Sequence, residues 1–191
     1  MGRALLVAEG TRRSNVSRLR LWLGVDDDGQ PYLPEAYTGH IRLDPKVSTD
    51  WEYAQILIMD GIKEASEHRL TSVLKMVRGA PLADSAPGQW LWAEDWRCEM
   101  MAVIRDVGVA LCQKALTRGD IDVARWAVSR ALMAVPGDDR LILCRIKTEH
   151  AAGNRPEVAR LALQVTRQAR ILGIDLPTET VALLHEVLEE T

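Results

Sequence analysis

The sequence predicts a mainly α-helical protein, made of antiparallel helical repeats behind a small N-terminal helix and a β-hairpin. From about residue 48 onward, apolar residues recur at steps of three and four, as on one face of a helix. Glycine and proline separate these helical stretches at short intervals. No alternating strand pattern appears after about residue 44. We therefore expect a small part at residues 1–46 and a helical part at residues 47–191.

Length and composition limit the class of protein. The chain has 191 residues, 47% of them hydrophobic, which is enough for the core of one domain with a smaller attachment. The net charge is −3. No apolar run reaches the roughly 18 residues that a membrane span needs, and the N-terminus lacks a signal-peptide pattern. Three widely spaced cysteines predict reduced, buried thiols in a cytoplasmic protein.

The first predicted helix lies in the basic part of the chain. Residues 1–24 contain five arginines and one glutamate, a net charge of +4, which leaves −7 for the remainder. Ser14 is a candidate N-cap and Gly24 a C-terminal stop, while Val16, Leu19 and Leu23 form an apolar stripe. A short basic helix that begins with arginine and asparagine suits the major groove of DNA. A solvated helix with one charged face is the more common alternative.

A turn and a hairpin are expected next. Residues 25–30, which read VDDDGQ, predict a tight turn. Three aspartates stand in it, but they lack the ligand spacing of a calcium loop, so we prefer the turn over a cation site. Tyr32-Leu33 and residues 40–43 predict two short strands around a turn at Thr38-Gly39.

Seven further helices are expected, at residues 47–65, 68–77, 96–118, 121–135, 139–152, 158–172 and 181–188. The glycines and prolines of residues 78–89 predict a loop. Glu94-Asp95 then supplies negative charge to a helix N-terminus. Trp90, Trp92 and Trp96 could line a ligand groove. Because residues 90 and 92 diverge on a helix, packing from two sides is the preferred interpretation.

The best-defined helical unit spans residues 119–153. Its first helix carries a stripe of apolar residues and ends at Pro136-Gly137, and Asp138 or Asp139 can cap the second. Gly119 and Gly153 stand 34 residues apart, the repeat length of a tetratricopeptide (TPR) unit. The small residues Ala124 and Ala131 resemble those that let TPR helices approach closely. An antiparallel bundle with a chance period is the alternative.

No motif for chemistry is present. The sequence lacks a nucleophile elbow, a phosphate loop, a C-x-x-C pair and an H-E-x-x-H helix. The four histidines are isolated from one another, so we interpret them as surface or structural residues. We therefore expect no enzyme activity, no cofactor and no metal site.

Beyond these patterns, the N-terminal part resembles the recognition helix and wing of OmpR-type winged-helix domains. The specific likeness is to the antibiotic regulatory protein (SARP) family of transcriptional activators. The matching positions are Val16, Leu19, Arg20, Leu23, Gly24, Gly39 and Leu43, and His40 replaces the family's usual tyrosine. The family places a small sheet and two helices before the recognition helix, where this chain has about ten residues. The resemblance therefore implies a truncated winged helix.

The C-terminal part resembles the bacterial transcriptional activator domain (BTAD), the TPR-like domain that follows the winged helix in this family. Asp50-Trp51 and Tyr53 match its opening, and residues 78–82, RGAPL, match its R-G-x-P-L motif. The stretch from Trp90 to Glu94 and the ending from Leu172 to Thr180 match two further motifs. The likeness thus covers nearly the whole chain from about residue 12.

The resemblance implies a regulatory protein-interaction domain of a bacterial transcriptional activator. Its partner is another protein or a second copy of the chain, with weak DNA binding through the basic helix and no membrane association. The resemblance assigns Arg12, Arg13 and Asn15 to base contacts, and Arg18 and Arg20 to phosphates or to holding the wing. The alternative is a free-standing TPR-like adaptor protein without DNA binding.

Overall fold

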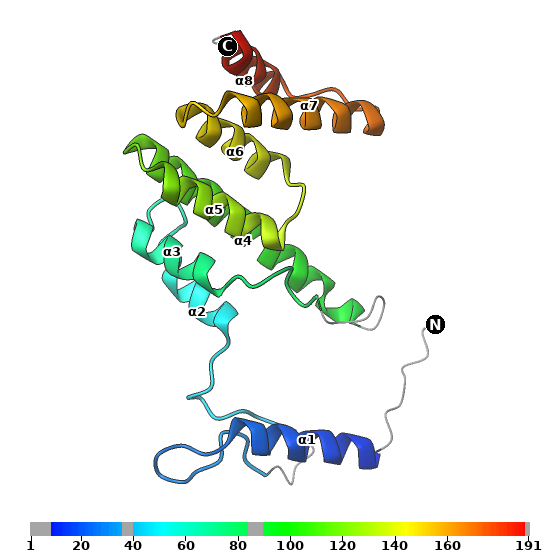
Figure 1. Ribbon diagram of the computed structural model, residues 1–191. Helices are drawn as coiled ribbons and strands as arrows, with labels where there is room; N and C mark the ends of the chain where they lie inside the picture. Colours follow the sequence, from blue (N-terminus) through cyan, green and yellow to red (C-terminus); the bar gives the residue numbers. More distant parts are fainter. Residues whose placement is uncertain (1–8, 36–39, 84–89, 190–191) are drawn as a thin grey trace. The chain divides into compact units, whose positions relative to one another are not determined.

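The structure is a computed structural model that describes residues 9–35, 40–83 and 90–189 (Figure 1). The chain divides into two compact units, Met1–Thr49 and Asp50–Thr191, here named unit 1 and unit 2. The described residues form helices, one isolated β-bridge and no longer strand. The predicted mainly α-helical class is therefore confirmed.

The described residues of unit 1 form one helix and a tight turn. Helix α1 (Glu9–Leu23) begins five residues before Ser14, so the predicted N-cap lies inside the helix. The predicted stop is confirmed, because Gly24 has a φ of +76° and its N–H donates to the Arg20 carbonyl at 3.0 Å. Leu33 is fully buried.

The predicted β-hairpin is wrong for the residues that the structure describes. Tyr32-Leu33 and residues 40–43 adopt no strand, while the turn expected at Thr38-Gly39 lies outside the described residues. An antiparallel bridge instead joins Val25 to Pro31 across the aspartate turn. Beside the two predicted strand segments, the Asp44 N–H donates to the Tyr32 carbonyl at 2.8 Å, and one such backbone bond does not make a strand pair among the described residues.

Unit 2 is a stack of helices that follow one another in chain order (Figure 1). The elements are α2 (Asp50–Leu57), α3 (Glu67–Met76), η1 (Leu91–Ala93), α4 (Glu94–Thr117), α5 (Ile121–Ala134), α6 (Asp139–Ala151), α7 (Arg155–Leu172) and α8 (Thr178–Glu189). One apolar core joins α2 to α6, and a second joins α6, α7 and α8. The small side chains of Ala124 and Ala131 are fully buried in the first core.

The turn after α4 recurs after α6. At the first, the Asp120 N–H donates to the Ala115 carbonyl at 2.9 Å, and Gly119 has a φ of +79°. At the second, the Asn154 N–H donates to the Glu149 carbonyl at 2.9 Å, and Gly153 has a φ of +70°. Each is a six-residue helix ending in which glycine takes the left-handed conformation.

The caps of α5 and α6 explain where these two helices begin. Asp120 accepts a hydrogen bond from the Val123 N–H at 3.0 Å, and Asp138 accepts one from the Leu141 N–H at 3.1 Å. Each carboxylate satisfies an N–H group that the first helical turn leaves without a partner. Of the two capping candidates in the sequence, Asp138 is the one used.

The helix predicted over residues 47–65 is wrong in its length. Helix α2 ends at Leu57, and turns occupy the following residues. Gly61 has a φ of +105°, which a helix cannot accommodate, and its N–H donates to the Ile58 carbonyl at 2.9 Å. The Asp60-Gly61 pair is a turn signal that outweighs the apolar periodicity around it.

Candidate binding surfaces

Helix α1 carries the predicted DNA-contacting side chains. Arg12, Arg13, Asn15 and Arg18 are all exposed. Arg12, Asn15 and Arg18 succeed one another at steps of three, which places them along one side of the helix, and Arg13 lies away from that line. The side chains of Arg12, Asn15 and Arg18 make no hydrogen bond or ion pair with another described residue.

Arg20 differs from the other arginines of α1. Its Nε donates to the Leu33 carbonyl at 2.7 Å, and its Nη2 donates to the Pro34 carbonyl at 3.3 Å. The guanidinium thus joins α1 to the segment that crosses it, beside the buried Leu33 side chain. Arg20 thus holds the segment after the helix, while its assignment to phosphates or to the wing stays a prediction.

In the aspartate turn of unit 1, the Asp26 carboxylate is bonded by groups of the same unit. The Oδ1 atom of Asp26 accepts hydrogen bonds from the N–H groups of Asp28 and Gln30, at 3.0 and 2.8 Å. Its other oxygen pairs with the Lys46 ammonium. Lys46 and the Gln30 N–H lower the pKa of Asp26. These contacts support the turn interpretation over a cation site.

Unit 2 exposes large apolar side chains at the start of α4. Trp90, Leu91, Trp92 and Trp96, here named the tryptophan surface, are exposed by 42%, 72%, 73% and 56%. The rings of Trp90 and Trp92 stack with centroids 5.8 Å apart. The predicted divergence of these two rings is wrong, because Trp90 precedes a 3₁₀ turn rather than lying on an α-helix with Trp92.

A pocket of about 730 Å³ adjoins this surface and is here named the α2–α4 pocket. It lies among α2, the end of α3, residues 78–83, Trp90 and the first half of α4. None of residues 94–103 of α4 is buried, so the packed core begins only at Ile104. The apolar walls include Trp51, Ala54, Val73, Met76, Trp90, Met100 and Ile104.

The pocket also has a polar corner. Among the described residues, Asp50 and Arg78 are the charged ones that line it, and the Arg78 Nη2 donates to the Asp50 Oδ2 at 3.2 Å. The sequence singled out both residues, in separate motifs, and the fold brings them together. Nothing in the apolar periodicity identified the pocket itself, because its walls come from several separate elements between residues 50 and 104.

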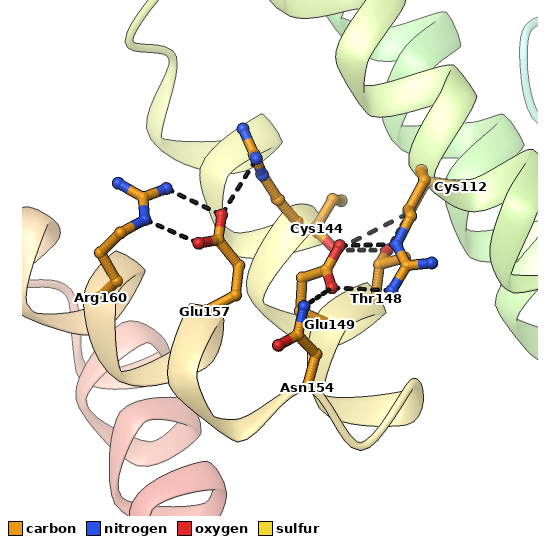
Figure 2. Close-up of polar contacts among 9 residues, drawn as sticks. Cys112, Cys144, Thr148, Glu149, Asn154, Glu157 and Arg160 are labelled. Carbon is orange, nitrogen blue, oxygen red and sulfur yellow. Dashed lines mark hydrogen bonds and ion pairs between the residues drawn. The ribbon is translucent and has the colours of Figure 1, made fainter.

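A polar cluster links α5, α6 and the N-terminus of α7 (Figure 2). The buried Glu149 carboxylate accepts two hydrogen bonds from Arg125, each at 2.8 Å, and a third from the Asn154 side chain at 2.8 Å. Arg125 and Asn154 lower the pKa of Glu149 against the effect of burial. Every oxygen of this carboxylate therefore has a partner within the fold, and the cluster stabilises the repeated turn.

The three cysteines have different surroundings. Cys112 and Cys144 are buried, and the Cys112 sulfur lies 3.4 Å from the Thr148 hydroxyl (Figure 2). The Cys112 thiol and burial raise the pKa of Cys144. Cys98 is exposed on the first half of α4, so the prediction that all three thiols are buried is wrong at this position.

No metal-binding cluster of three or more His, Cys, Asp or Glu side chains occurs within residues 9–35, 40–83 and 90–189. The same residues contain no helix that is both long and apolar enough to cross a membrane. Comparisons with protein-family models, with curated proteins and with solved structures find no match.

Proposed function

We propose that this chain is a non-enzymatic, cytoplasmic regulator of the SARP type, in which residues 47–191 form a TPR-like BTAD that binds another protein or a second copy of the chain. The tryptophan surface is the observation that carries this proposal. Tryptophan is enriched at the centres of protein interfaces, where its large apolar area is covered by the partner. Four neighbouring apolar side chains left in water are a strong reason to expect such a partner.

The repeated helix ending supports the TPR-like part of the proposal. Gly119 and Gly153 close α4 and α6 with the same hydrogen-bond pattern, 34 residues apart. Ala124 and Ala131, on the helix that follows the first of these turns, are fully buried, as close helix packing requires. Stacked helical repeats form extended surfaces that bind proteins.

The exposed side of α1 supports a partial DNA-contacting element. Arg12, Asn15 and Arg18 are free to face a duplex, and arginine and asparagine are the side chains that read guanine and adenine. The helix and the aspartate turn keep the order of the winged-helix resemblance, although the described residues form no strands there. We therefore propose weak DNA binding that depends strongly on salt.

Self-association is tested by sedimentation of the full chain over a range of concentrations. We expect wild-type protein to associate and Trp92→Glu to remain monomeric. Leu163→Glu is the matched control, because Leu163 on α7 is 70% exposed and lies outside the tryptophan surface. If the wild-type protein is a monomer at every concentration, self-association is removed from the proposal. If both variants lose self-association equally, it is due to nonspecific hydrophobic contacts rather than to the tryptophan surface.

DNA binding is tested separately by titrating a labelled duplex with the full chain at two salt concentrations. The proposal expects weak binding that falls as salt rises. No binding at low salt, together with association through the tryptophan surface, would favour the adaptor protein without a DNA role. Tight binding that survives high salt would contradict the view that the DNA-contacting element is partial.

A further inference from the structure

We propose that the α2–α4 pocket binds a small molecule that has an apolar, aromatic body and one anionic end. This inference goes beyond the regulatory role proposed above and does not depend on it. The pocket volume of about 730 Å³ falls within the range of roughly 300–1,000 Å³ that is typical of small-molecule sites. Its walls are mostly apolar, with few polar groups, which is also typical of such sites.

The walls favour an aromatic body. Trp51 on α2 and Trp90 before η1 each contribute an indole to the lining. Met76 and Met100 add flexible thioether side chains that adapt to irregular shapes and make favourable contacts with aromatic rings. A planar apolar molecule can therefore contact indole and thioether groups from three helical elements at once.

The polar corner favours an anionic end. Arg78 uses one N–H group on Asp50, at 3.2 Å, and its side chain is 84% exposed. The guanidinium fork has five donors in a plane, so it retains donors for a carboxylate or sulfonate of a ligand. Asp50 holds the arginine at the mouth of the pocket and is itself 56% exposed, so it can turn toward water when a ligand anion binds.

The wall formed by residues 78–83 has a fixed, strained backbone. Leu82 has a φ of +54° and is the one described non-glycine residue with a positive φ. Its carbonyl accepts a hydrogen bond from the Arg97 Nη2 at 3.2 Å, and the Val77 carbonyl accepts one from the Arg130 Nη1 at 3.3 Å. Backbone strain of this kind persists where the surrounding structure maintains it, often around ligands. The two hydrogen bonds connect this wall and the residue before it to Arg97 on α4 and Arg130 on α5.

Two fluorescent probes test the proposal with the full chain. Anilinonaphthalene sulfonate has an aromatic body with one anionic group, and N-phenylnaphthylamine has the same body without it. We expect both to bind saturably at one site and to quench tryptophan fluorescence. Arg78→Gln should weaken the sulfonate probe about tenfold, the loss of one charge-assisted hydrogen bond, and leave the neutral probe unchanged.

A pocket-filling variant and a surface variant complete the test. Ala80 lines the pocket but is exposed, so Ala80→Trp should block both probes without unfolding the protein, which circular dichroism checks. Leu163→Lys, which removes an exposed apolar side chain of α7, should bind both probes like wild type. Three results would overturn the proposal. These are binding that does not saturate, binding that Ala80→Trp leaves unchanged, and an equal loss of affinity for both probes in Arg78→Gln. If an added peptide binds the pocket and neither probe does, the proposal is wrong and the pocket is a site for a protein segment.

Discussion

Gly108 on α4 faces Ala131 on α5 so closely that a methyl group at Gly108 would lie 2.5 Å from the Ala131 Cβ atom. The same methyl group would lie 3.2 Å from a methyl carbon of Leu141 on α6. Three successive helices therefore meet at a point where one of them has no side chain. This contact explains why Ala131 is small and why α4, α5 and α6 share one core.

Enlarging either residue at this contact should destabilise unit 2. Gly108→Ala would gain about 1 kcal/mol in an open helix, but here the clash should reverse the sign. Ala131→Leu should cost about 1–3 kcal/mol through overpacking, and Ala124→Leu a similar amount. Urea melts give these free energies, with Ser129→Leu on the exposed side of α5 as the control. A gain in stability for Gly108→Ala would contradict the close approach.

The two matching turns should respond alike to the same change. Gly119→Ala and Gly153→Ala each force a side chain into the left-handed region, which costs about 1–2 kcal/mol. Gly79→Ala is the matched control, because Gly79 has open space around it and no positive φ. Thermal melts should show losses of similar size for the two turn variants and none for the control. Indifference at either glycine would mean that the turns are not equivalent.

The Glu149 carboxylate should make part of the stability dependent on pH. Since folding lowers its pKa below the ordinary value of 4.5, its contribution is present above that value and is lost as the pH falls through the folded pKa. Glu149→Gln should cost about 1–3 kcal/mol at pH 7, and the difference from wild type should shrink in acid. Urea melts over a pH series measure this, and Glu99→Gln on the exposed side of α4 should show no such trend.

The sequence predicted the helices that have clear ends. The glycines at 119 and 153, Pro136-Gly137 and Asp138 gave boundaries for α5 and α6 that agree with the structure to within one residue, because caps and turn residues act locally. At α2 the prediction followed the apolar spacing through residue 65, although the Asp60-Gly61 pair signals a turn and the helix ends at Leu57. Helix α1 begins before Ser14, the residue predicted to cap it. Ser14 lies inside the helix with its side chain exposed, so a serine alone does not mark a helix N-terminus.

The pocket and the Gly108 contact could not be predicted in the same way. A glycine within a helical stretch is a weak sign of close packing, but it does not identify the helix opposite. The α2–α4 pocket depends on where α4 leaves the core, and residues 94–103 carry apolar side chains at ordinary helical spacing. Local patterns determine which face of a helix is apolar, whereas the covering of that face depends on the whole fold.

The thiols should differ in reactivity as their burial does. Cys98 is exposed and should react at once with a thiol reagent in the folded protein. Cys112 and Cys144 are buried, and the raised pKa of Cys144 disfavours its reactive thiolate, so both should react only after unfolding. The chromophore released without and with denaturant gives the number of reactive thiols in the folded and in the unfolded protein. Loss of the fast phase in Cys98→Ser is the control, and rapid reaction of all three thiols would contradict the packing of α4 against α6.

Arg18 and Arg20 should separate DNA binding from the structure of unit 1. Arg18→Ala removes an exposed charge, so it should weaken binding to all duplex sequences alike and reduce the salt slope by about one, without altering the fold. Arg20→Ala removes the hydrogen bonds to the Leu33 and Pro34 carbonyls, so it should shift the backbone amide resonances of neighbouring residues even without DNA. Nuclear magnetic resonance spectra and duplex titrations of both variants measure the two effects. If Arg20→Ala left the free spectrum unchanged and altered only DNA binding, Arg20 would be a DNA-contacting residue rather than the link between α1 and the segment that crosses it.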